Sequence, residues 1–169
     1  MPLDRVIVTQ PTEDNGMSNS DLQLTSQAFA DGESIPDEYG YTNRNVNPPL
    51  SIDGIPSDTE SQVLIIDDPD AQEPAGKIWD HWVVWNIDSE RTEIPEDWEP
   101  TDAVEGENDF GEPGYGGPNP PDRPHTYQFR LFALDTTLGV DEGATKDDVE
   151  QAMEGHVLAQ TQLDGTYAP

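Results

Sequence analysis

The sequence has 169 residues, a third of them hydrophobic, so it suits a single domain with one packed core over residues 1–169. Its 36 acidic and 7 basic residues give a formal net charge of −29 at pH 7, which argues against nucleic acid or an anionic membrane surface as a partner. The absence of cysteine excludes disulfides, thiolate nucleophiles and cysteine-ligated metals, and no apolar stretch is long enough for a membrane-spanning helix.

The first half of the chain predicts short strands separated by turns. Leu22 and Leu24 alternate with polar residues, and a second short strand is predicted from Leu50 to Ile52. The runs from Gln62 to Asp67 and from Lys77 to Ile87 are rich in β-branched and aromatic residues. Both runs are too short and too β-prone to favour helix, so they are predicted to be the central strands.

The second half predicts two loops, a strand and a helix. Residues 88–113 are acidic and contain prolines, which predicts a long loop, and residues 114–121 form a rigid loop of glycines and prolines. From His125 to Asp135 apolar residues occur on both faces, which predicts a strand covered on both sides.

One helix is predicted near the C-terminus. Thr145 can cap it, with Asp148 three residues later as in a capping box, and Gly155 provides a stop. A last strand is predicted from Val157 to Gln162. Because strands dominate, the sequence predicts a mainly β, sandwich-like domain with a short helix near the C-terminus.

Acids and histidines lie where these strands end or begin. Asp68 and Asp70 follow directly on a strand, in a loop stiffened by proline, and a carboxylate placed there can hold a histidine N–H and favour its charged form. His81 lies inside an apolar segment, so it needs a polar partner if it is buried. His125 and Tyr127 are two residues apart on a strand and therefore share a face.

The loop of residues 114–121 offers backbone N–H groups with few side chains in the way, and such a loop can form a nest for an anion. It lacks the Lys-Ser or Lys-Thr pair of a nucleotide-binding P-loop. His156 follows the predicted helix end and is interpreted as structural, since a cation there complements the helix dipole.

These segments, in this order, resemble the phosphatidylethanolamine-binding protein family, and most of all its prokaryotic branch, often called Raf kinase inhibitor-like. The resemblance covers residues 22–167 and is carried by Asp68-Pro69-Asp70-Ala71, Trp79-Asp80-His81-Trp82-Val83-Val84, Gly114-Tyr115-Gly116-Gly117-Pro118 and His125-Thr126-Tyr127. Four ordered motifs together are far more specific than any one of them.

The resemblance implies two antiparallel β-sheets with short helices and a shallow pocket for phosphate-like or carboxylate anions, including phospholipid head groups in some members. By matching positions, the ligand-binding residues are Asp68, Asp70, His81, His125 and Tyr127, with Gly117 and Pro118 as a wall. His81 and His125 are expected to donate hydrogen bonds and partial positive charge to the anion, and the Tyr127 hydroxyl to add a further donor. The resemblance implies no catalytic residues, no metal and no cofactor, and it names a kinase or a protease as the class of protein target.

The sequence also departs from the family pattern. Gln72 stands where proline usually follows the Asp-Pro-Asp-Ala motif, and Asp80 stands where animal members carry a histidine. The sequence ends soon after Tyr167, so the C-terminal helix that borders the pocket of animal members is expected to be absent. Prokaryotic relatives look dimeric, so the resemblance implies a homodimer, which no residue of this sequence specifies.

A second function for the same residues stays open. Asp68, Asp70, His81 and His125 could instead support acid–base hydrolysis or bind a metal through oxygen and nitrogen ligands.

The scattered acidity is interpreted as the surface of a protein from an extreme halophile. At about 1 M salt the Debye length falls to roughly 3 Å, so the repulsion between these acids is screened. The N-terminal residues lack the apolar core of a signal peptide, which favours a cytoplasmic location.

Overall fold

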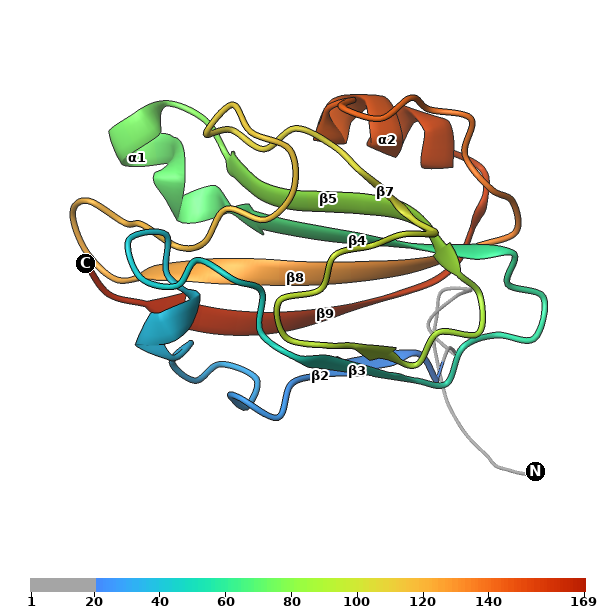
Figure 1. Ribbon diagram of the computed structural model, residues 1–169, viewed down its shortest axis with the longest axis horizontal. Coiled ribbons are helices and arrows are strands. Elements are labelled where there is room, and N and C mark those ends of the chain that lie inside the picture. Colours follow the sequence, from blue (N-terminus) through green and yellow to red (C-terminus); the bar gives the residue numbers. More distant parts are fainter. Residues whose placement is uncertain (1–20) are drawn as a thin grey trace.

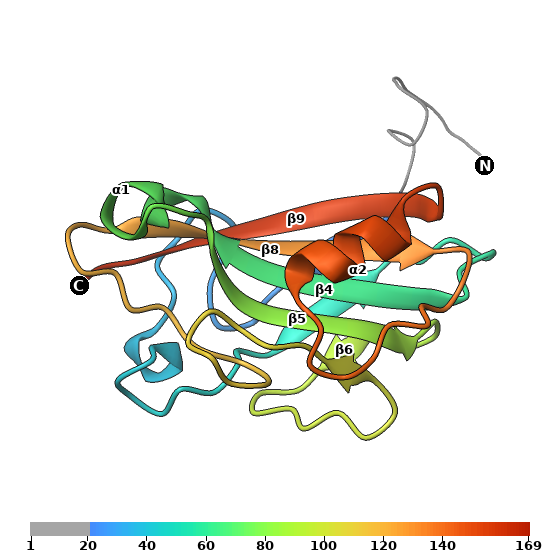
Figure 2. The same ribbon diagram turned by 90° about the horizontal axis from the view of Figure 1, so that it is seen from above.

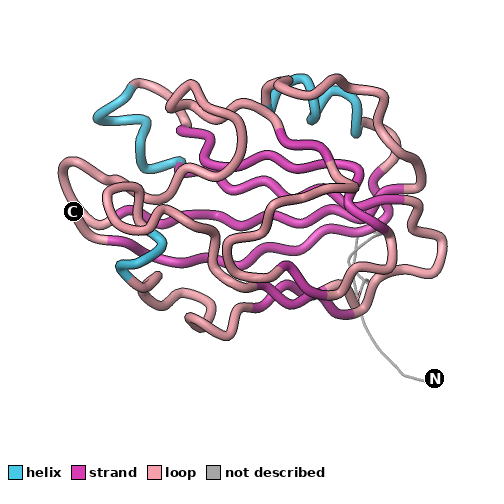
Figure 3. The backbone as a smooth tube through the Cα atoms, viewed as in Figure 1, coloured by secondary structure: helices cyan, strands magenta, loops and turns pink. Residues whose placement is uncertain are grey.

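The computed structural model describes residues 21–169, which form two antiparallel sheets and a few short helices (Figures 1 and 3). The smaller sheet has the order β2-β3-β6 and the larger the order β7-β5-β4-β8-β9. The strands are β2 (Gln23–Thr25), β3 (Leu50–Asp53), β4 (Ser61–Asp68), β5 (Trp79–Asp88), β6 (Glu93–Ile94), β7 (Val104–Glu105), β8 (His125–Leu134) and β9 (Val157–Tyr167). The helices are the 3-10 turns η2 (Asp37–Tyr39) and η3 (Pro69–Ala71) and the α-helices α1 (Gln72–Ala75) and α2 (Lys146–Met153). The predicted mainly β fold with a helix near the C-terminus is confirmed; the prediction of one domain over residues 1–169 extends beyond the described residues.

The larger sheet is covered on both faces. One face packs against the smaller sheet through a core that includes Leu24, Ile52 and Leu64. The opposite face packs under α2 through a second cluster that includes Ile65 and Val149, and Figure 2 shows α2 lying against the large sheet. Because both faces are buried, β4 is buried along its whole length and carries four consecutive apolar residues, Val63 to Ile66, instead of an alternating pattern. The same burial confirms the predicted two-sided strand at β8.

The helix α2 begins and ends as the sequence predicts. The hydroxyl of Thr145 accepts from the backbone N–H of Asp148, and the Asp148 carboxylate accepts from the backbone N–H of Thr145, which completes the capping box. Gly155 follows the helix with a left-handed φ of 82°, a conformation that glycine adopts without steric cost.

Three sequence predictions need correction. Residues 88–113 are not a single long loop, because β6 and β7 pair there with the edges of the two sheets. Each of these strands has only two residues, too few for a periodic pattern to be visible in the sequence. The last strand continues past Gln162 to Tyr167, because the backbone ladder with β8 holds its polar residues in place. The short helix α1 was not predicted, since Pro74 lies within it.

The strand ends that carry the candidate site meet at one end of the large sheet. The antiparallel register pairs Asp68 at the end of β4 with Trp79 at the start of β5. On its other side β4 pairs with β8, so Asp67 lies opposite Gln128 near the start of that strand. Among the described residues no helix is long and apolar enough to cross a membrane.

Candidate functional site

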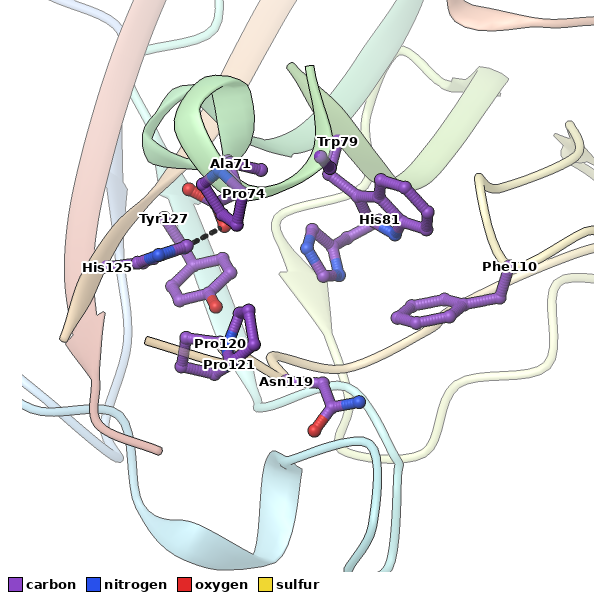
Figure 4. A pocket seen from close by; sticks show the side chains of 12 residues that line it. Ala71, Pro74, Trp79, His81, Phe110, Asn119, Pro120, Pro121, His125 and Tyr127 are labelled. Atoms are coloured by element: carbon purple, nitrogen blue, oxygen red, sulfur yellow. Dashed lines mark hydrogen bonds and ion pairs between the residues drawn. The ribbon is translucent and has the colours of Figure 1, made fainter. Parts of the chain in front are cut away.

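A cavity of about 210 Å³ opens where β4, β5 and β8 meet (Figure 4). Its lining residues are Asp68, Ala71, Pro74, Ala75, Trp79, His81, Phe110, Asn119, Pro120, Pro121, His125 and Tyr127. Four predicted ligand-binding residues therefore meet at one pocket: Asp68, His81, His125 and Tyr127. Three others, Asp70, Gly117 and Pro118, do not line it.

His125 is held between two carboxylates. Its Nδ1 lies 2.5 Å from Oδ2 of Asp68, and its Nε2 lies 2.7 Å from Oδ1 of Asp122. Burial opposes the charge on this ring, but the hydrogen bonds to Asp68 and Asp122 outweigh it and raise the pKa of His125. Asp68 therefore orients His125 and favours its charged form. Neither N–H of His125 is left to donate to a ligand.

Asp68 itself is almost fully buried, and its carboxylate links the pocket to the turn that follows β4. Burial raises its pKa, while the bonds from His125 and from the backbone N–H of Asp70 work in the opposite direction. The Asp70 N–H donates to Oδ1 of Asp68 at 2.9 Å, which fixes the 3-10 turn in place.

His81 is buried and turns one nitrogen toward the protein and the other toward the pocket. Its Nδ1–H donates to the carbonyl oxygen of Gly116 at 2.7 Å, and the backbone N–H of Gly116 donates back to the carbonyl of His81 at 2.9 Å. Figure 4 shows the ring projecting into the cavity on the side of Tyr127. Burial lowers the pKa of His81 from 6.5 to about 4, so the ring is neutral near pH 7. It therefore presents an acceptor nitrogen to the pocket, not the charged donor expected from the sequence.

Tyr127 and Trp79 bring unpaired donors to the pocket. The hydroxyl of Tyr127 and the indole N–H of Trp79 are buried, and neither makes a hydrogen bond of ordinary geometry within residues 21–169. Burial and the nearby Asp68 carboxylate raise the pKa of Tyr127, so its hydroxyl keeps its proton. Buried polar groups normally have partners, and a ligand in the cavity would supply them.

Asp70 stabilises the rim of the pocket from outside. Its Oδ2 accepts the backbone N–H of Thr126 at 2.9 Å, and its Oδ1 lies 3.8 Å from the guanidinium of Arg123. Asp70 therefore fixes the start of β8 and does not contact the cavity.

The glycine loop is a packing element and not the anion nest predicted from the sequence. The N–H of Gly116 donates to the His81 carbonyl, and the N–H of Gly117 donates to Oδ1 of Asn45 at 2.7 Å. A Cβ on Gly117 would meet the carbonyl oxygen of Tyr39 at 2.1 Å, so this position needs glycine for close approach. The N–H groups of both glycines are already used, that of Gly116 by β5 and that of Gly117 by the segment that follows η2. The neighbouring residues Asn119, Pro120 and Pro121 form the wall instead of Gly117 and Pro118.

Several residues in and around the pocket were not predicted from the sequence. Asp122 lies three positions before His125 in a proline-rich turn. Because this segment is neither a helix nor a strand, no periodic pattern in the sequence indicates that the two side chains meet. Phe110 lines the cavity beside His81, with ring centroids 5.7 Å apart, and Tyr41 stacks on its other face at 3.9 Å. The aromatic wall comes from a loop, where hydrophobic periodicity carries no signal.

The four residues considered as metal ligands do not form a metal centre. Among residues 21–169 no group of three or more histidine or acidic side chains is arranged to hold a metal ion. Asp70 lies outside the cavity, and the Nδ1 atoms of His81 and His125 are bonded to protein oxygens.

Comparison with known proteins places this pocket in a family context. The family model described as phosphatidylethanolamine-binding protein matches residues 25–168. A UPF0098 protein of Methanothermobacter thermautotrophicus is 46% identical over 151 residues, covering 86% of this chain and 98% of its own. A UPF0098 protein of Chlamydia muridarum is 44% identical over 148 residues, with the same coverage of both chains.

Two solved structures share the fold at high similarity. A phosphatidylethanolamine-binding protein homologue from Chlamydia trachomatis superimposes with a TM-score of 0.83 and 41% identity, covering 89% of this chain and 98% of its own. Escherichia coli YbcL, described as a member of the mammalian PEBP family, gives a TM-score of 0.81 with 34% identity, covering 88% and 98%. The family resemblance read from the four motifs is therefore confirmed, and the chain belongs to the phosphatidylethanolamine-binding protein family.

Proposed function

We propose that this protein binds a small ligand bearing a phosphate or carboxylate group in the cavity beside His81, with a phospholipid head group as one member of that class. The observation that carries the proposal is the buried hydroxyl of Tyr127, a residue that lines the cavity. This hydroxyl makes no hydrogen bond of ordinary geometry among the described residues, although the Asp68 carboxylate and the backbone of Asn119 lie near it. The indole N–H of Trp79 adds a second donor of the same kind. An anionic oxygen would accept from either group, since hydrogen bonds to charged acceptors are the stronger ones.

The role we propose is binding and not catalysis. A general base working near pH 7 needs a pKa close to that value. The pKa of His81 lies at about 4, and both nitrogens of His125 are bonded to carboxylates. Modulation of a kinase or a protease would be a consequence of such binding, and nothing in the pocket selects one target.

Isothermal titration in molar KCl tests the proposal, with phosphate, phosphoethanolamine and acetate as ligands. The high salt screens the net charge of −29, which repels anions at long range. Tyr127→Phe should weaken phosphate binding by about tenfold, the equivalent of roughly 1.4 kcal/mol for one hydrogen bond to a charged group. Tyr167→Phe is the matched control, because the Tyr167 hydroxyl bonds to Asn43 and Asp37 away from this cavity.

Undetectable heat with all three ligands for the native protein would refute a binding role for the cavity. Equal affinities for native protein and Tyr127→Phe would remove the observation on which the proposal stands. Phosphoethanolamine recovered after the titration should be chemically intact by phosphorus NMR, and free phosphate in that sample would favour the hydrolytic alternative.

A further inference from the structure

We infer that this pocket selects ligands that carry a hydrogen-bond donor beside their anionic oxygen. It therefore binds the singly protonated form of a phosphate monoester, and it discriminates against the dianion and against phosphodiesters, which have no such donor. The inference rests on the proposed anion-binding function and specifies the chemical form of the ligand. It follows from which hydrogen-bonding groups the protein has already used.

His81 presents an acceptor to the cavity, and its tautomer is fixed by the backbone. Its two hydrogen bonds with Gly116, at 2.7 and 2.9 Å, hold ring and loop together from both directions. A carbonyl oxygen only accepts, so Nδ1 must carry the proton. A ring flip would break this buried hydrogen bond and leave the Gly116 carbonyl without its partner. Nε2 therefore faces the cavity as a lone pair that needs a donor from the ligand.

The charged and titratable groups around His81 do not reverse this state. Asp67 on β4 and Asp109 in the loop after β7 favour a charged ring, and Tyr127 on β8 packs edge-on at 5.1 Å without a charge. The two acids are themselves paired, Asp67 with Arg130 and Lys146, and Asp109 with Lys77. Burial outweighs their attraction and keeps the pKa of the ring near 4.

On the opposite side of the cavity, the described residues offer no free cation. The imidazolium of His125 is shared by Asp68 and Asp122, so this cluster carries more negative than positive charge. Arg123 lies toward Asp70 and Asp122 and is not among the lining residues. A phosphate dianion would thus meet no N–H from either imidazole, whereas a P–OH group could donate to His81 while its anionic oxygen accepts from Tyr127.

The matched ligands for the test are methyl phosphate and dimethyl phosphate. At about pH 5 both carry mainly a single negative charge, but only methyl phosphate has a P–OH, because the second pKa of a phosphate monoester is about 6. Titration calorimetry in molar KCl should show methyl phosphate binding at least about tenfold more tightly at that pH, the equivalent of roughly one hydrogen bond. Repeating the titration in two buffers with different enthalpies of ionisation gives the number of protons taken up on binding.

Above about pH 7 the affinity for methyl phosphate should fall nearly tenfold per pH unit, with uptake of close to one proton per site, because the dianion must be protonated to fit. Equal binding of both phosphates at low pH, or a flat pH profile for methyl phosphate, overturns the inference and leaves the proposed function intact. Proton uptake with dimethyl phosphate would show that His81 takes the proton, which also overturns it. No heat with either phosphate or with acetate refutes the proposed function itself, and this inference with it.

Discussion

Oδ1 of Asp122 lies 2.7 Å from Nε2 of His125, on the ring edge that faces away from the bond to Asp68. One imidazolium therefore joins the buried end of β4 to the exposed turn before β8, since the Asp122 side chain is 36% exposed and that of Asp68 only 4%. His125 acts as a clamp between two segments of chain, and this removes it from the set of free donors that the sequence suggested.

Replacing Asp122 should change the titration of His125. In Asp122→Asn the pKa of His125 should fall toward its ordinary value of 6.5, because the negative charge of one of the two carboxylates that raise it is lost. A raised folded-state pKa contributes stability that is present below about pH 6.5 and lost as pH rises through the folded value. The stability difference between native protein and Asp122→Asn should therefore be largest in mildly acidic buffer. Histidine Cε1 proton shifts against pH, with urea unfolding at each pH, measure both effects.

Asp135→Asn is the matched control for that experiment. Asp135 accepts from Nδ1 of His156 at 2.8 Å on the surface, so its loss should leave the His125 titration unchanged. An unaltered His125 pKa in Asp122→Asn would contradict the clamp.

Lys146 should contribute far more to stability than Lys77. Its side chain is only 9% exposed, and its ammonium nitrogen lies 2.8 Å from Oδ1 of Asp80 and 3.3 Å from Oδ2 of Asp67. Lys146→Met would leave two acids buried without this partner, and breaking a buried pair costs about 3–5 kcal/mol. Burial already raises the pKa of Asp80, so the loss should shrink in acid, where Asp80 takes up a proton. Urea unfolding in molar KCl measures the difference.

Lys77→Met is its control, because Lys77 is 52% exposed in its pair with Asp109. An exposed pair contributes about 0–1 kcal/mol, so this variant should unfold almost as the native protein does. An equal loss of unfolding free energy in the two lysine variants would show that the burial of Lys146 does not determine its contribution to stability.

Gly117→Ala should destabilise the pocket wall. The added Cβ would lie 2.1 Å from the backbone oxygen of Tyr39, which cannot move away as a flexible side chain could. Overpacking of this kind costs about 1–3 kcal/mol, and it should also weaken phosphate binding because Asn119 and Pro120 follow in the same loop. Thermal unfolding measures the loss of stability, and titration calorimetry measures the loss of phosphate affinity. Gly139→Ala, where no atom lies within 4 Å of the new Cβ, should change neither, and a comparable loss there would count against the close-approach explanation.

Salt should stabilise the folded protein strongly. With a net charge of −29 the compact state repels itself, and this repulsion is screened as the Debye length falls to roughly 3 Å near 1 M salt. The melting temperature, measured by circular dichroism, should rise from dilute buffer to molar KCl. Sorbitol at equal osmolality should give a much smaller rise, and an equal rise would attribute the effect to water activity and not to charge.

Much of the fold could be predicted because it depends on local patterns. The β-branched runs at β4 and β5 and the capping residues Thr145 and Asp148 specify their elements over a few neighbouring positions. The two-residue strands β6 and β7 could not be predicted, since they exist only through pairing with distant edges.

For the pocket, the sequence alone determined which residue types gather there: strand-end carboxylates, two histidines and a tyrosine in an order typical of one family. Only the tertiary structure decided how each one is used. The partners of His81 and His125 come from loops distant in sequence or without periodicity, and burial, a property of the whole fold, sets the protonation of each ring. For that reason the sequence could suggest two histidine donors, while the folded chain provides one neutral acceptor and one clamped cation.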